Sequence, residues 1–192
     1  MSKIKLAYQT PDAWTDAVLA DLDAFLLDHA AAEKKASGMA VSMLSHYPDR
    51  VELVTAMADL AVEELVHYRE VVKFIHARGQ ITAKDTKDHY VVEFRKAMSK
   101  DSNLYFLDRL LIGGIIEARG AERFGLVAEA LETGKLKTFY QSIARSEQRH
   151  QDLMVDLALI YFDRETVIER LAQLISIEAT IISAQPHRAA LH

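Results

Sequence analysis

The sequence predicts an all-α protein, a four-helix bundle with one long crossover and an additional C-terminal helix. Only seven glycines and three prolines interrupt the 192 residues, and apolar residues recur at spacings of three and four, as they do on one face of a helix. No stretch alternates in the manner of a strand. A chain of this length with 50% apolar residues is expected to fold as one domain over residues 1–192.

Turn residues and caps set the expected boundaries. The first helix is expected to begin at Thr10-Pro11-Asp12, with Thr10 as its N-cap, and to run without a break to about Tyr47, before Pro48-Asp49 turns the chain. Gly79 and Thr133-Gly134 mark two further ends. The later helices are expected to span Arg50 to Arg78, Asn103 to Glu132, Lys135 to Phe162, and Asp163 to Ser183.

The links between these helices predict the topology. Two links are short, which indicates two antiparallel helical hairpins, whereas residues 80–102 form a long connection with a short helix around Tyr90 to Met98. One long crossover in a four-helix bundle is the ferritin-like arrangement. The tail after Pro186 is expected to be loose.

A repeated pattern of glutamate and histidine lies inside the four long helices. His67 and His150 each follow a glutamate by three positions, and a lone glutamate precedes each pair by 31 or 30 residues. One Glu-x-x-His is expected by composition alone about half the time. Two copies with matching lone glutamates are a much more specific signal. The six residues are Glu33, Glu64, His67, Glu117, Glu147 and His150.

The four glutamates lie in the middle of the apolar seams that steps of three and four define on their helices. A carboxylate among apolar side chains costs several kcal/mol unless its charge is compensated. The seams carry no lysine or arginine, so two divalent metal ions are the expected compensation, and a histidine three residues after a glutamate adds an imidazole on the same face. One Glu from each of two helices and Glu-x-x-His from each of the other two is the ligand set of ferritin-like di-iron and di-manganese proteins.

The second helix leaves two questions open. It is also apolar along a neighbouring track that includes Val54, Ala58 and Leu65, and Glu63 lies four residues before His67. The repeat with Glu147 and His150 selects Glu64 over Glu63.

Other polar residues have weaker signals. His29 is expected to be a satisfied core histidine, with a contact to Glu33 as the alternative. The last helix has an apolar seam that leaves Glu178 on its flank, and Tyr140 and Tyr161 are expected to pack. Exposure is expected for the remaining histidines, His46, His76, His89, His187 and His192.

Composition narrows the function. The absence of cysteine excludes disulfides, thiolate zinc sites and iron–sulfur clusters within the chain. The longest aliphatic run, Leu110 to Ile116, is too short to span a membrane, and the first ten residues lack a secretion signal, so a cytoplasmic location is expected. A net charge of −5 gives no general attraction to nucleic acid. The basic bias of the long connection, at Lys84, Lys87, Arg95, Lys96 and Lys100, is the best nucleic-acid contact that the sequence offers.

Carboxylate and imidazole ligands favour iron or manganese, and we expect two iron ions. Four stretches carry a resemblance to a known family: Asp28-His-Ala-Ala-Ala-Glu33-Lys-Lys-Ala, Leu60-Ala-Val-Glu-Glu64-Leu-Val-His67-Tyr, Ile116-Glu117-Ala-Arg-Gly-Ala-Glu-Arg-Phe124 and Ser146-Glu147-Gln-Arg-His150. They resemble the tRNA 2-methylthio-N6-isopentenyladenosine hydroxylases over nearly the whole chain. Glu-Ala-Arg-x-x-Glu-Arg-Phe is the most specific part.

The resemblance implies a non-haem di-iron monooxygenase that uses O2 to hydroxylate the isopentenyl group of the modified adenosine at position 37 of tRNA. It implies the same six metal ligands. Because the chain has no cysteine, an external donor such as a reductase or ferredoxin is expected to supply electrons. The alternative is a bacterioferritin-like iron-storage protein. Those proteins commonly carry a haem-ligating methionine at the position that Leu65 occupies here, so Leu65 counts against this alternative. A monomer or small oligomer fits the enzyme, and a large hollow cage fits storage. A metal-free helical interaction module is a further alternative.

Overall fold

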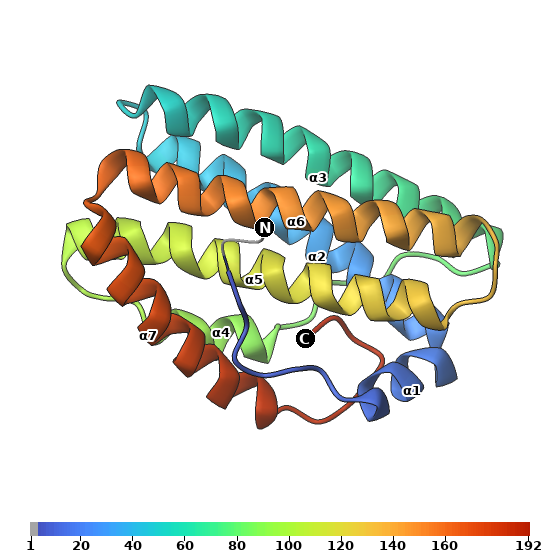
Figure 1. Ribbon diagram of the computed structural model, residues 1–192. Helices are drawn as coiled ribbons and strands as arrows, with labels where there is room; N and C mark the ends of the chain where they lie inside the picture. The colour runs from blue at the N-terminus through green and yellow to red at the C-terminus, as the bar shows by residue number, and fades with distance from the viewer. Residues whose placement is uncertain (1–3) are drawn as a thin grey trace. The chain divides into compact units, whose positions relative to one another are not determined.

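The computed structural model describes residues 4–192, and these form seven helices and no strand (Figure 1). The all-α prediction is confirmed. The first three residues, part of the stretch read for a secretion signal, lie outside the described residues. No helix in residues 4–192 is long and apolar enough to cross a membrane.

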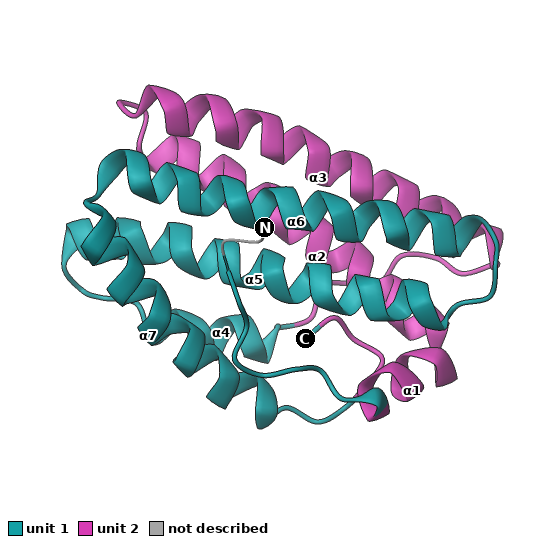
Figure 2. Ribbon diagram, viewed as in Figure 1, with its two compact units in different colours: residues 1–12, 87–187, 192 teal, residues 13–86, 188–191 magenta. Residues whose placement is uncertain are grey.

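The chain forms two compact units, coloured separately in Figure 2. One comprises residues 13–86 and 188–191 and holds the first helical hairpin. The other comprises residues 1–12, 87–187 and 192 and holds the second hairpin with its covering helices. The expectation of one domain over residues 1–192 remains a prediction.

The first unit is built on an antiparallel pair, α2 (Leu22–His46) and α3 (Val51–Ala77), joined by a short turn. The Ser37 hydroxyl of α2 donates to the Ala61 carbonyl of α3 at 2.8 Å. The inward track predicted for α3 is confirmed, because Leu53, Met57, Leu60 and Val71 are buried. On the neighbouring track Leu65 is exposed.

The predicted first helix is interrupted at Asp21, which separates α1 (Asp12–Ala20) from α2. Asp21 leaves helical geometry at φ −141° and ψ 68°, and its carboxylate accepts from the Ala24 amide at 3.0 Å. Aspartate is a strong N-cap because its side chain satisfies an amide that the helix leaves unbonded. The expectation of one continuous helix was wrong because a break of one residue leaves the apolar spacing almost unchanged.

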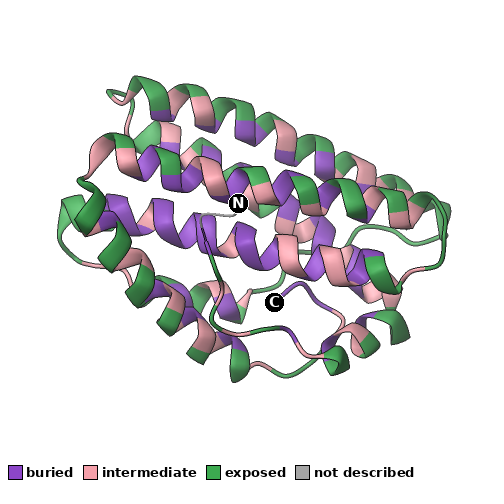
Figure 3. Ribbon diagram, in the orientation of Figure 1, coloured by how far each residue is buried: buried purple, intermediate pink, exposed green. Residues whose placement is uncertain are grey.

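The second unit is built on α5 (Ser102–Ala130) and α6 (Lys135–Tyr161). Helices α4 (His89–Arg95) and α7 (Arg164–Ser183) pack on each other, and α7 packs on α5. The short helix expected in the long connection is therefore present, and α7 ends at Ser183 as predicted. Helix α5 also packs on α6, and most of its residues are buried (Figure 3).

Two expectations about the chain ends were wrong. Thr10 does not cap α1; instead its amide and hydroxyl both donate to the Glu122 carboxylate, at 2.9 and 2.8 Å. The tail is not loose. The Trp14 indole donates to the Ala190 carbonyl at 3.1 Å, and the Leu191 amide donates to Asp28 at 2.7 Å. These side chains hold a segment whose sequence carries no helical signal.

Candidate metal centre

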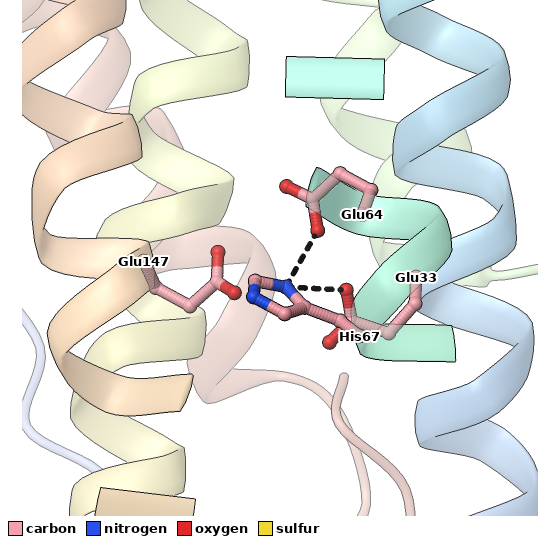
Figure 4. A group of neighbouring side chains, drawn as sticks. All are labelled: Glu33, Glu64, His67 and Glu147. Atoms are coloured by element: carbon pink, nitrogen blue, oxygen red, sulfur yellow. Dashed lines mark hydrogen bonds and ion pairs between the residues drawn. The ribbon is translucent and has the colours of Figure 1, made fainter. Parts of the chain in front are cut away.

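In the first unit, three of the predicted ligands come together. Helix α2 supplies Glu33, and α3 supplies Glu64 and His67; each is buried and offers a donor atom within 4.8 Å of the others. His67 Nδ1 lies 3.1 Å from Glu64 Oε2 and 3.6 Å from Glu33 Oε2, as the dashed lines in Figure 4 mark. We call these three residues the first triad.

The second unit has the equivalent group. Helix α5 supplies Glu117, and α6 supplies Glu147 and His150; their donor atoms also lie within 4.8 Å of one another, and all three residues are buried. His150 Nδ1 lies 3.3 Å from Glu147 Oε2. We call these residues the second triad. The predicted six residues are thus gathered three in each unit.

The donor chemistry of both triads fits a metal ion. Neighbouring donors around an ion that binds each at about 2.1 Å lie roughly 3 Å apart, which is close to the Nδ1–Oε2 distances of both Glu-x-x-His pairs. Two buried carboxylates in each unit need positive charge nearby. Carboxylate oxygens and imidazole nitrogens suit a hard or intermediate divalent metal such as iron or manganese.

The structure distinguishes Glu64 from Glu63. Glu64 is fully buried beside His67 Nδ1, whereas the Glu63 side chain is 39% exposed and its Oε1 lies 3.8 Å from His67 Nε2. Glu64 therefore occupies the position equivalent to that of Glu147, as the repeat predicted. Glu63 contacts the outer nitrogen of the same imidazole.

His29 extends the first triad. It is fully buried, and its Nε2 lies 2.5 Å from Glu33 Oε1. Burial, together with the nearby charge of His67, lowers the pKa of His29 to about 3. A neutral imidazole with its proton on Nε2 donates to the carboxylate and fixes its orientation. The alternative of a contact to Glu33 is thus confirmed.

Without metal, His67 has a strongly perturbed pKa. Burial lowers it, but hydrogen bonds and charge from Glu33 and Glu64 outweigh burial and raise the pKa of His67 to about 10. With a pKa this high the imidazole holds its proton at neutral pH, and its positive charge compensates the two carboxylates. A divalent cation bound by these residues would replace that proton, since a ligating imidazole nitrogen must be deprotonated.

The sequence analysis missed a buried ionic cluster on another side of α5. Arg119 is fully buried and binds both oxygens of Glu178, from Nε at 2.9 Å and from Nη2 at 3.1 Å. Its guanidinium also contacts Glu122 and donates to the Tyr8 carbonyl. The Tyr90 hydroxyl donates to Glu178 at 3.2 Å. The signal was present in the Glu-Ala-Arg-x-x-Glu-Arg motif, which contains Arg119 and Glu122.

This cluster corrects the interpretation of α7. Glu178 was expected on the flank, beside a seam that includes Ile168, but Glu178 is fully buried and Ile168 is 52% exposed. Of the predicted seam, Ile182 is buried, and the buried face also contains Val167 and Leu174. Glu178 lies on this buried face, where its carboxylate pairs with Arg119.

His192 also differs from expectation. It is buried, its ring stacks on Tyr90 with centroids 4.4 Å apart, and its Nδ1 lies 2.9 Å from Asp88 Oδ2. The other four histidines expected at the surface are exposed as predicted: His46, His76, His89 and His187. Tyr140 is buried and stacks on Phe124, which supports its packing role.

Comparison with known proteins gives concordant results. The model of the family described as tRNA-(MS[2]IO[6]A)-hydroxylase (MiaE) matches residues 2–192. A tRNA 2-(methylsulfanyl)-N(6)-isopentenyladenosine(37) hydroxylase from Pseudomonas putida is 35% identical over 170 residues, which cover 88% of this chain and 82% of the relative. The hydroxylase of the same name from Salmonella typhimurium is 34% identical over 131 residues. That match covers 68% of this chain and about half, 48%, of the relative.

A solved structure is also similar. Protein 43 with aldehyde deformylating oxygenase activity from Synechococcus matches with a TM-score of 0.92 and 33% sequence identity, covering 98% of this chain and 96% of that one. The ferritin-like fold class predicted from the sequence is confirmed by this likeness.

Proposed function

Because this chain belongs to the tRNA-(MS[2]IO[6]A)-hydroxylase (MiaE) family, we propose that it hydroxylates the isopentenyl group of 2-methylthio-N6-isopentenyladenosine at position 37 of tRNA. The match over residues 2–192 is the observation that carries the proposal. The relatives that share the family are named as hydroxylases, so the enzyme class expected from the sequence is confirmed. A tRNA substrate fits the predicted cytoplasmic location.

The proposed cofactor is a pair of iron ions, and the six residues of the triads are the proposed ligands: Glu33, Glu64, His67, Glu117, Glu147 and His150. Bound iron would supply the activation of O2 and the insertion of one oxygen atom into a C–H bond of the isopentenyl group, with the second atom leaving as water. The protein would supply these side chains and keep them in position. His29 orients Glu33 through its Nε2 proton, and burial keeps bulk water from the carboxylates.

Reduction of the second oxygen atom to water takes two electrons and two protons. The chain has no cysteine and therefore no iron–sulfur cluster or dithiol of its own. We propose that a separate reductase or ferredoxin supplies the electrons.

Iron storage of the bacterioferritin type is not favoured, because the matched family and both curated relatives are hydroxylases. A second candidate activity is the oxygenation of an aldehyde. The Synechococcus protein is described as having aldehyde deformylating oxygenase activity, and it is 33% identical over nearly the full length of both chains. Activity on an aldehyde would use the same triads.

The test is to express the chain in cells that make the isopentenylated nucleoside but lack its hydroxylated form. Iron per purified chain is measured, and digested tRNA is chromatographed. We expect about two irons per chain and a new hydroxylated nucleoside. Glu147→Ala is the matched inactive control. Iron binding with unchanged tRNA would contradict the tRNA assignment, and conversion of an added aldehyde by the same protein would then support the second candidate.

A further inference from the structure

Helix α3 exposes an apolar strip that the proposed reaction leaves unexplained. Val51 is 71% exposed, Val62 64% and Leu65 51%, and Val66 is also exposed. Single exposed apolar residues are common, but these lie on the side of α3 that faces away from its buried seam, and exposed residues recur along the whole helix in Figure 3. An apolar strip bordered by charges is typical of a protein interface.

The exposed charges on either side of Val62 and Val66 are separated by sign. Glu52 and Asp59 precede these two valines, and Arg69 and Lys73 follow them; all four charged residues are exposed. Steps of four and three residues connect the outward positions into a seam of the kind that pairs helices in coiled coils. This seam consists of Thr55, Asp59, Val62, Val66, Arg69 and Lys73.

The seam is self-complementary when it is reversed. Its members lie at equal distances on either side of residue 64, so that an antiparallel copy aligns an acidic or neutral position with a basic one and valine with valine. The aligned seam positions are Val62 with Val66, Asp59 with Arg69, and Thr55 with Lys73. The same symmetry aligns Glu52 with His76, which lie beyond the ends of the seam. A two-fold axis requires this relation, since each contact must occur twice with the roles exchanged.

We propose that α3 is a homodimer interface, in which it packs antiparallel against α3 of a second copy about a two-fold axis level with residue 64. Val62 packs on Val66 of the partner subunit, and Asp59 pairs with Arg69 of the partner subunit. Arg69 and Lys73 already contact Glu70 within α3, at 3.4 and 2.7 Å. Exposed pairs of this kind contribute little, so both cations remain available to a partner.

A second copy fits this face better than RNA does. Phosphate recognition needs a surface of one sign, but the same helix also carries the carboxylates of Glu52, Asp59 and Glu70. Helix α3 is about 40 Å long. A standard interface buries about 800 Å² of surface on each partner, and the outer face of α3 offers roughly half of that area. We therefore expect a dimer that dissociates on dilution in the micromolar range. The proposal does not depend on the reaction catalysed.

Sedimentation velocity of the full-length, metal-loaded protein between about 1 and 100 µM, a range that brackets micromolar affinity, tests the proposal. The wild-type protein should shift from monomer to dimer. Asp59→Arg or Arg69→Asp alone should weaken dimerisation at least about tenfold, because each places like charges opposite one another. The double variant Asp59→Arg/Arg69→Asp should recover affinity to within about threefold of wild type.

Mixing the two single variants is the sharpest measurement. Asp59→Arg protein and Arg69→Asp protein should each remain monomeric but should form a heterodimer together, because their charges are complementary only across the antiparallel pair. The control is Glu169→Arg on α7, at an exposed position, which makes the same change of charge as Asp59→Arg. This variant should dimerise normally. Circular dichroism reports whether each variant retains its helices.

A monomeric wild-type protein over the whole range, or a double variant that stays dissociated while folded, would overturn the proposal. So would a monomer whose tRNA affinity falls on Arg69→Asp, since the face would then be an RNA contact. None of these results bears on the proposed reaction, because hydroxylation is measured separately from the nucleoside product.

Discussion

The two triads contain the same donors, but their surroundings differ. In the first, His29 lies one turn before Glu33 and binds it, and Glu63 contacts the outer nitrogen of His67. The position one turn before Glu117 is Gly113, and a side chain there would meet the Met154 methyl group, since an added Cβ would lie 3.4 Å from it. The repeat in sequence therefore preserves the glutamates and the histidine of each triad but not the groups around them.

The helices that carry the lone glutamates are also supported differently. Helix α5 is covered by α7, and the buried Arg119–Glu178 pair ties these two helices together. The described residues show no equivalent buried arginine on α2. Instead, the exposed Lys34 pairs with Asp85, and the exposed Lys35 donates to the Thr86 carbonyl. Helix α5 thus has a buried ionic clamp to a covering helix, whereas the ion pair from Lys34 of α2 to Asp85 lies at the surface.

The largest expected effect is loss of a ligand, and it tests whether the triads are equivalent. Glu64→Ala and Glu147→Ala should each lower hydroxylation more than about 100-fold and reduce bound iron to a similar degree. The loss of a ligand should have a larger effect than the loss of a residue that only supports a ligand, which typically costs about 10-fold to 100-fold. Iron analysis and nucleoside chromatography check this. Glu63→Ala is the matched control and should retain iron. A large iron loss in Glu63→Ala alone would reverse the choice between the two glutamates.

The next effect concerns the clamp that only the second unit has. Arg119→Met should destabilise the protein by about 3–5 kcal/mol, because it leaves the Glu178 carboxylate buried without its partner. Chemical denaturation measures the change. Arg119→Met/Glu178→Leu should recover much of the loss, and Lys73→Met, which breaks an exposed pair with Glu70, should change stability by less than about 1 kcal/mol. Equal effects of the buried and exposed substitutions would contradict a stabilising clamp.

The asymmetry between His29 and Gly113 leads to a smaller effect. His29→Phe keeps the ring volume but removes the donor to Glu33, so iron affinity should fall about 10-fold to 100-fold while the helices remain intact. Competition with a chelator measures it. His29→Gln keeps a donor and should restore part of the affinity. If both variants bind iron as the wild type does, His29 is only a packing residue.

The smallest effects distinguish two glycines in equivalent helices. At Gly114 in α5 an added Cβ would lie 3.1 Å from Ile4 Cδ1 and from Met154 Cβ, whereas at Gly38 in α2 it meets nothing within 4 Å. Gly114→Ala should cost about 1–3 kcal/mol through overpacking. Gly38→Ala should stabilise by about 0.5–1 kcal/mol, because alanine favours the helix. Thermal melts of both variants show whether each substitution raises or lowers stability. A change in the same direction for both variants would be evidence against the close approach at Gly114.

The amino-acid sequence alone was enough to predict the helical class, the two hairpins and the inward positions of the six glutamates and histidines. It could do so because helical periodicity is a local property: a residue spaced three or four positions from apolar neighbours lies on their face wherever the helix packs. The choice of Glu64 over Glu63 also came from periodicity, through the match with Glu147. The metal ligation itself stays a prediction.

Other features depend on contacts between segments that are far apart in the chain. Glu178, which the helical pattern did not predict to be buried, pairs with Arg119, 59 residues away. The tail is ordered by Trp14 and Asp28, which contact it over sequence separations of 176 and 163 residues. Such contacts join distant segments through single side chains, and no pattern within one helix records them.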